Sequence, residues 1–214
     1  MLRRSLLMLA MWSLAAPAFA QDTHSAPIPT PTESSSSSRP IQAPRQGRTR
    51  WAVAGSHGIA AEINNSIVID MSSIWVRWSQ VLGGREALAG TKKFLGGQPA
   101  VGIELSPFTY FDQSPRTWGG AWHLVYEHRL SPTEKVRPVI RAGTGLLFAS
   151  SNVPPGETRF NYTLFVGAGL EIAVSKSRAI QIDYRLHHVS NANTGGRNPG
   201  INAHTIVLGL AWGF

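Results

Sequence analysis

The sequence predicts an all-β protein, an eight-stranded antiparallel transmembrane β-barrel formed by residues 51–214. Three observations predict this class. Segments of about ten to fourteen residues alternate between apolar and polar side chains, as strands of outer-membrane barrels do. Their number is even, which lets the first and last strands pair as antiparallel neighbours. No helical apolar stripe and no apolar run of about 18 residues competes with them.

Residues 1–20 have the pattern of a secretory signal peptide. Arg3 and Arg4 precede an apolar run from Leu6 to Ala16, and Ala18-Phe19-Ala20 forms an A-x-A cleavage site. A membrane anchor fits less well, because the run is shorter than the roughly 20 residues of a spanning helix. The chain holds no Cys, so it offers neither thiol chemistry nor a lipid-modified cysteine after the cleavage site.

Residues 21–50 change in composition to Pro, Ser, Thr and Gln and include an unbroken serine run over 34–38. Such a segment buries too little apolar surface to offset its ordering entropy, which predicts a disordered leader. Arg45, Arg48 and Arg50 end it, and we expect a solvated basic linker rather than a phosphate site.

The eight predicted strands follow one another with turn signals between them, including Asn64-Asn65, Ser131-Pro132 and Gly195-Gly196. They cover residues 51–63, 68–81, 100–111, 118–130, 136–149, 161–174, 178–190 and 202–214.

The two faces of each strand differ in a way that favours a membrane barrel. In segment 161–174 one face carries Tyr162, Leu164, Val166, Ala168, Leu170, Ile172 and Val174. A soluble barrel with an apolar interior would show the same alternation. Secretion, aromatic residues near strand ends and the closing Trp212-Gly213-Phe214 favour lipid on the apolar side.

The opposite face carries charges that we expect to form a paired polar lumen. An eight-stranded barrel has an interior just wide enough to be filled by side chains, so a structural role is favoured over a catalytic one. Glycines within strands, as in Gly143-x-Gly145 and Gly167-x-Gly169, would relieve crowding there. The expected lumen charges are Glu104, Glu127, Arg129, Arg141, Glu171, Asp183 and Arg185.

His188 and Ser190 are the first candidates for chemistry. They share the apolar face of strand 178–190, and residues two apart on a strand lie roughly 6.5 to 7 Å apart at Cα. An imidazole and a hydroxyl can then lean into hydrogen-bond reach, which is the arrangement of a base beside a nucleophile. Taken alone, H-x-S is too short to exclude a His and a Ser that merely end a strand.

The position of this pair strengthens the interpretation. If both termini lie in the periplasm, His188 and Ser190 fall at the outer end of their strand, and Asn202 and His204 open the next strand on the same lipid-facing side. Polar groups facing lipid are costly and indicate a functional site. The substrate they would meet is a lipid of the outer leaflet. His204 is expected to be an interfacial residue or a supporting partner.

The segment His188-Val189-Ser190-Asn191-Ala192, followed by Asn198-x-Gly200-Ile201, resembles the lipid A 3-O-deacylase family of Gram-negative outer membranes. The resemblance covers about residues 51–214, and the eight-strand layout agrees with it. It implies an outer-membrane serine esterase that hydrolyses the acyl chain ester-linked at the 3-position of lipid A. By that resemblance Ser190 is the nucleophile and His188 its general base. Asn191, Asn198 and Gly200 then support the site or its oxyanion hole.

The sequence departs from the family pattern at Asn202, where the resemblance implies a glutamate that orients the histidine. An Asn can accept a hydrogen bond from the imidazole and fix its tautomer, but it cannot stabilise the imidazolium by charge. We therefore expect Asn202 to be the third member of the site. Either the deacylase activity is lower than with a glutamate, or another group assists the histidine.

Other ligands are not indicated. The His spacing matches no metal motif, and no cofactor is implied. The formal charge is +8 for the whole chain, and removal of Arg3 and Arg4 with the signal peptide lowers it by two. The basic mature charge fits the anionic phosphates of lipid A or lipopolysaccharide better than nucleic acid, given the predicted compartment. A monomer and a homodimer are both compatible with the sequence. The alternative function is a non-catalytic structural or adhesive eight-stranded outer-membrane barrel.

Overall fold

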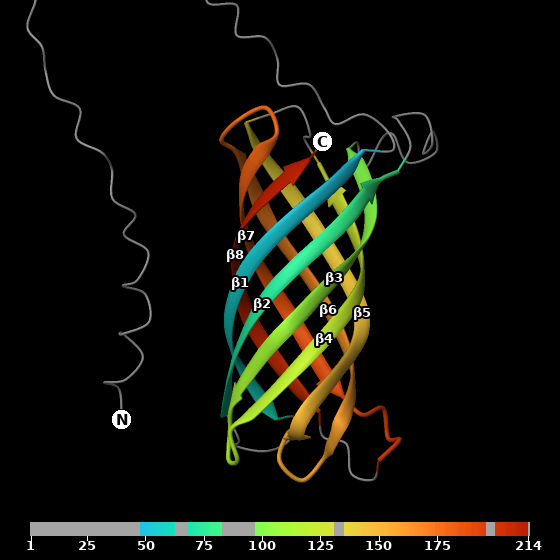
Figure 1. Ribbon diagram of the computed structural model, residues 1–214, viewed down its shortest axis with the longest axis vertical. Coiled ribbons are helices and arrows are strands. Elements are labelled where there is room, and N and C mark those ends of the chain that lie inside the picture. Colours follow the sequence, from blue (N-terminus) through green and yellow to red (C-terminus); the bar gives the residue numbers. More distant parts are fainter. Residues whose placement is uncertain (1–47, 63–67, 83–96, 131–134, 196–199, 214) are drawn as a thin grey trace, which may run out of the picture. The chain divides into compact units, whose positions relative to one another are not determined.

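The computed structural model describes residues 48–62, 68–82, 97–130, 135–195 and 200–213 (Figure 1). Within them lie eight strands and no helix long and apolar enough to cross a membrane. The strands are β1 (Thr49–Glu62), β2 (Val68–Val81), β3 (Gln98–Asp112), β4 (Thr117–Arg129), β5 (Val136–Val153), β6 (Thr158–Ala173), β7 (Arg178–Ser190) and β8 (Ile201–Gly213).

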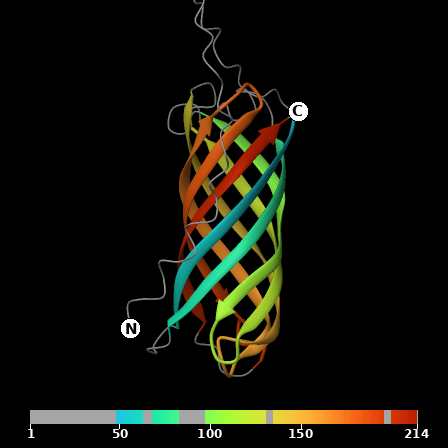
Figure 2. The same cartoon turned by 60° about the vertical axis from the view of Figure 1, so that its left-hand side comes forward.

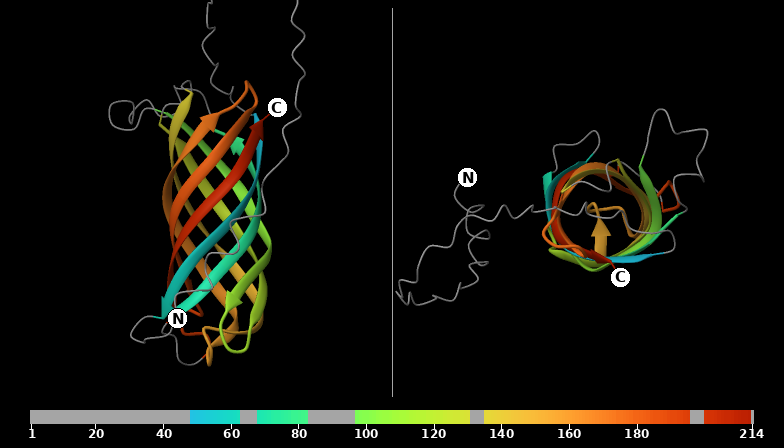
Figure 3. Two further views of the ribbon diagram at one scale, coloured as in Figure 1. Left: turned by 90° about the vertical axis from the view of Figure 1, so that its left-hand side faces the viewer. Right: turned by 90° about the horizontal axis from the view of Figure 1, so that it is seen from above.

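The strands form one closed antiparallel barrel, as predicted. Each strand pairs with the next along the chain, and β8 pairs with β1 from Arg50 opposite Gly213 to Glu62 opposite Ile201. Figures 2 and 3 show the continuous wall and, from above, the ring. Closure leaves no edge strand, so the ladder can satisfy the backbone groups that lipid cannot.

The observed strand bounds agree closely with those predicted from alternation. β2 and β7 have the predicted limits, whereas β5 continues to Val153 and β6 begins at Thr158, because these strands extend into a hairpin closed by the Glu157 amide on the Pro154 carbonyl at 3.1 Å. The predicted signal peptide and nearly all of the predicted leader lie outside the described residues, as does Phe214.

The outward faces are mainly apolar, and the buried inward faces carry the charged side chains together with an apolar cluster at one end, which confirms the predicted alternation. In β6, Tyr162, Leu164 and Val166 are exposed, while Thr163 and Phe165 between them are buried. This places an apolar belt on the outside of the wall, as a bilayer requires.

The lumen contains the predicted charges, and all seven are buried. Arg141 is the centre of the network: it donates to Glu127 at 2.8 Å, to Glu171 at 2.7 Å and to Asp183. Arg185 reaches Glu104 through two hydrogen bonds of 2.7 and 3.0 Å. Each charge is thus compensated inside the barrel, where an unpaired one would be costly.

Two arginines of the lumen network were not expected from the sequence. Arg50, expected in a solvated leader, instead lies in β1, is 6% exposed and donates to Glu171 at 2.9 Å. Arg77 of β2 donates to Glu104 at 3.0 Å. The leader assignment for Arg50 was wrong because strand alternation, which begins at Thr49, turns its side chain inward.

The strand glycines relieve crowding, as predicted. A Cβ at Gly167 would lie 2.5 Å from the backbone oxygen of Tyr184 and 2.9 Å from Cγ of Arg185, and a Cβ at Gly143 would meet the ring of Phe165. Side chains at these positions would displace the neighbours that fill the lumen.

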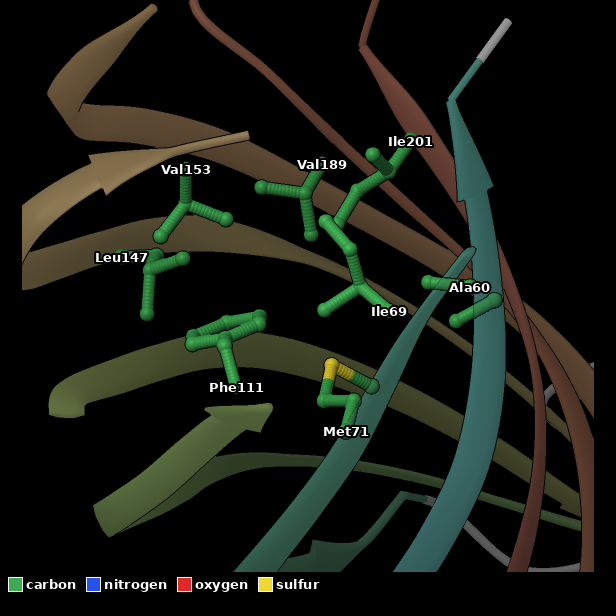
Figure 4. Close-up of a cluster of buried hydrophobic side chains, with 9 residues drawn as sticks. Ala60, Ile69, Met71, Phe111, Leu147, Val153, Val189 and Ile201 are labelled. Atoms are coloured by element: carbon green, nitrogen blue, oxygen red, sulfur yellow. The ribbon is translucent and has the colours of Figure 1, made fainter. Parts of the chain in front are cut away.

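An apolar cluster fills the barrel at the end away from Thr49 and Gly213 (Figure 4). Its residues are 2% exposed or less and come from six strands, so the cluster ties the strand ends together. Its members are Ala60, Ile69, Met71, Phe111, Leu147, Val153, Val189, Ile201 and Ala203.

Candidate active site

The candidate site lies where β7 ends and β8 begins. Val189 and Ile201 are register partners and point inward into the apolar cluster, with 1% and 0% exposure. Alternation therefore turns their neighbours His188, Ser190 and Asn202 outward. Packing of two buried side chains thus fixes the direction of the three polar ones.

His188 and Asn202 are register partners and hydrogen-bonded to each other. The distance from His188 Nδ1 to Asn202 Oδ1 is 2.8 Å. An amide oxygen only accepts, so this bond requires a hydrogen on Nδ1. In the neutral imidazole the lone pair is then on Nε2, the nitrogen that a general base needs.

Gly200 approaches His188 and Ser190 together. A Cβ at Gly200 would lie 3.1 Å from Cε1 of His188 and 3.3 Å from Cβ of Ser190. The side chains of His188 and Ser190 therefore both lie next to the Cα of Gly200. Gly200 also has φ of 63°, in the left-handed region that favours glycine. The close approach and the backbone conformation both select glycine here.

Asn191 faces inward rather than towards the outward surface of Ser190. It is fully buried, donates from Nδ2 to Glu157 at 3.1 Å, and accepts the Asn193 amide on Oδ1 at 2.9 Å. Its carbonyl accepts the Thr194 amide at 3.0 Å. Asn191 thereby holds the turn after Ser190 through side chain and backbone. Asn198, the other predicted supporting residue, lies outside the described residues.

Two further outward polar pairs lie near this site. Nδ1 of His204 is 2.6 Å from the Tyr184 hydroxyl, and Nδ1 of His57 is 3.0 Å from the Ser72 hydroxyl. Sequence reasoning singled out His204 but missed His57 and Ser72. The signal was present, because His57 alternates with the outward Val53 and Ile59.

Solved structures resemble the chain in fold. A crystal structure of the outer membrane enzyme PagL aligns with a TM-score of 0.54 and 17% identity over 74% of this chain and 97% of that one. A crystal structure of Neisserial surface protein A aligns with a TM-score of 0.50 and 12% identity over 78% of this chain and 97% of that one. No curated protein matches the chain.

The sequence matches the family model described as lipid A 3-O-deacylase (PagL) over residues 70–211. This match covers more than half of the 214 residues and decides between the two function classes that the sequence left open. The chain belongs to the lipid A 3-O-deacylase family and is a carboxylic ester hydrolase of the bacterial outer membrane.

Proposed function

We propose that Ser190 is the nucleophile of the deacylase, His188 its general base and Asn202 the acceptor that orients the base. The observation that carries this proposal is the 2.8 Å bond between His188 and Asn202 on the outward face, with Ser190 two residues further along the same strand. These side chains would face the lipid rather than the filled lumen.

In the acylation step, Nε2 of His188 takes the hydroxyl proton of Ser190 as Oγ attacks the carbonyl carbon of the 3-linked ester. The tetrahedral intermediate collapses by breaking the bond between that carbon and the sugar oxygen. The imidazolium returns its proton to this oxygen, which leaves as the 3-hydroxyl of lipid A. The acyl chain remains as an ester on Ser190.

In the second half of the reaction, His188 takes a proton from a water that attacks the acyl-serine. The bond to Oγ breaks, the fatty acid leaves and Ser190 recovers its proton. Asn202 holds Nδ1–H throughout and keeps the lone pair on Nε2. It lacks the negative charge that would stabilise the imidazolium.

The oxyanion of both intermediates needs donors close to Ser190. The Asn193 and Thr194 amides are bonded to Asn191 within the turn. The proposal therefore assigns this role to the amides immediately after Ser190 and to Asn198. Asn191 is a positioning residue that shapes the turn, and Gly200 lets the loop approach the pair. Ser190, His188 and Asn202 all come from one barrel, so the proposed chemistry needs no second copy.

The test compares the chain with its Ser190→Ala variant in a Gram-negative host that lacks a lipid A deacylase of its own. Mass spectrometry of extracted lipid A should show loss of the 3-linked acyl chain with the unchanged protein and none with the variant. Ser150→Ala is the matched control, because Ser150 is an exposed serine at the same end of the barrel. Deacylation that persists in Ser190→Ala would refute the assigned nucleophile.

A further inference from the structure

Four polar side chains extend the outward surface of the candidate site across β7, β8, β1 and β2. They form the two bonded pairs Tyr184–His204 and His57–Ser72, and we call them the polar line. Their apolar neighbours on the same face include Leu186, Ile59 and Ile206, which are 44%, 55% and 51% exposed. Polar groups are thus set into an otherwise apolar surface.

The strand register makes the polar line continuous with the catalytic residues. His204 follows Asn202 by two residues on β8, a separation of about 7 Å along the strand. His57 lies opposite Ile206 and His204 opposite Ile59, so the two histidines are diagonal neighbours about 7 to 8 Å apart at Cα. Ser72 is the direct partner of His57 on β2.

Three members of the polar line, His204, His57 and Ser72, lie at nearly one level around the barrel. Tyr184 is four residues from His188 on β7 and reaches this level through the bond of its hydroxyl to His204. The strands lean against the barrel axis (Figure 1), and in such barrels the lean is about 35–45°. Along the barrel axis, the register partner on the next strand, from β8 to β1 or from β1 to β2, lies about 3 Å nearer the catalytic end. The steps of two residues from Asn202 to His204 and from Ile59 to His57 each lead about 5 Å away from that end. His188, His204, His57 and Ser72 therefore lie within about 5 Å of one height.

This arrangement of polar side chains has an unfavourable free energy in lipid, and the barrel does not need it in order to fold. Polar groups on the lipid side of a barrel are unfavourable unless they meet the interface or a polar ligand. Interfacial anchoring explains an isolated Tyr–His pair, such as Tyr126 with His128 at 3.1 Å at the opposite end of the wall. It does not explain a second pair, His57–Ser72, on neighbouring strands at the height of the reacting groups.

We propose that the hydroxyl and imidazole groups of the polar line bind the hydroxyl and amide groups of the lipid A sugar headgroup and so place the 3-linked ester at Ser190. The line spans two to three strand spacings of about 4.8 Å, which suits a disaccharide. Asp70 is exposed on the outward face of β2, two residues from Ser72. Its negative charge favours neutral sugar groups over a phosphate at this position. The inference rests on the proposed function, because it takes Ser190 as the point of reaction.

The test measures kcat and KM of the purified full-length protein on lipid A in mixed micelles. Tyr184→Phe and Ser72→Ala each remove one hydroxyl and should raise KM about 3- to 10-fold, the value of one lost hydrogen bond, with little change in kcat. Tyr126→Phe is the matched control and should leave both constants unchanged, since its pair with His128 lies at the other end of the barrel.

A second measurement separates recognition from chemistry. The affinity of the Ser190→Ala variant for lipid A can be measured by tryptophan fluorescence. Combining Ser190→Ala with Ser72→Ala or Tyr184→Phe should weaken this binding by the same factor by which each substitution raises KM. Unchanged KM and unchanged binding would overturn the headgroup proposal, and so would an equal rise of KM in Tyr126→Phe. Turnover by Ser190→Ala would instead overturn the assigned nucleophile, while the binding comparison would still decide the role of the polar line.

Discussion

The lumen and the outward surface of the same strands contain polar groups of two different kinds. In the lumen, Arg141 contacts three carboxylates, and every member of the group is shielded by the wall. On the outward surface, His188 and Asn202 form a single bond on a face that is mainly apolar. The lumen groups compensate one another, whereas His188 retains Nε2 for a proton that must come from elsewhere. The comparison teaches that an oriented imidazole on the lipid-facing side, rather than the number of charges, marks the reactive side of this wall.

The largest expected effect is on the outward surface. His188→Asn removes the base but keeps a polar side chain of similar reach, so turnover of lipid A should fall about 10³- to 10⁴-fold. Initial rates on lipid A micelles check this, and the circular dichroism of the barrel should be unchanged. Near-normal turnover would show that another group acts as the base.

The next effect belongs to the lumen and should appear in stability. Arg141→Leu leaves Glu127, Glu171 and Asp183 without their shared partner and should lower the free energy of unfolding by about 3–5 kcal/mol. Urea unfolding in detergent or lipid vesicles measures it. The exposed pair of Arg116 with Asp112, at 3.9 Å, is the control, and Arg116→Ala should cost less than about 1 kcal/mol. If Arg141→Leu abolished turnover in the folded barrel, the division of roles between the two surfaces would be wrong.

A smaller effect on turnover is expected at the glycine that meets the site. Gly200→Ala adds a Cβ 3.1 Å from the His188 ring and 3.3 Å from Cβ of Ser190, so the pair must shift and kcat should fall about 10- to 100-fold. Gly156→Ala is the matched control, because Gly156 also has positive φ, 87°, but its Cβ would meet open space. Equal losses of kcat in the two variants would assign the effect to backbone strain alone.

The smallest expected effects are at Asn202. Asn202→Ala removes the acceptor of the 2.8 Å bond and should lower kcat about 5- to 10-fold. Asn202→Asp keeps the length of the side chain and supplies the missing negative charge, so kcat should rise several-fold. In a serine-protease triad, loss of that charge lowers kcat about 10⁴-fold. Part of that loss reflects a wrong histidine tautomer, which Asn202 avoids, so the gain expected here is smaller. Rates on lipid A for both variants decide this. If neither substitution changes kcat, Asn202 does not orient the base.

Much of this molecule could be predicted from sequence because a strand has a period of two. Alternation gave the eight strands, both limits of β2 and β7, the inward direction of Asp183 and the outward direction of His188, Ser190 and Asn202. It also gave the closed barrel, since an even number of antiparallel strands can join without an edge. The family resemblance, read from the residues around Ser190, agreed with the family match over 70–211.

The tertiary structure decided what alternation cannot: which residue of one strand lies opposite which residue of the next. Register joins His188 to Asn202 and His57 to Ser72. Closure of the barrel brings Arg50 of β1 across the lumen to Glu171 of β6, 121 positions away in the chain. It also places Gly200 against the reacting pair and turns Asn191 inward to Glu157. A period of two fixes the face of each side chain, but only the closed wall and its packed interior fix the distances between strands, and chemistry depends on those distances.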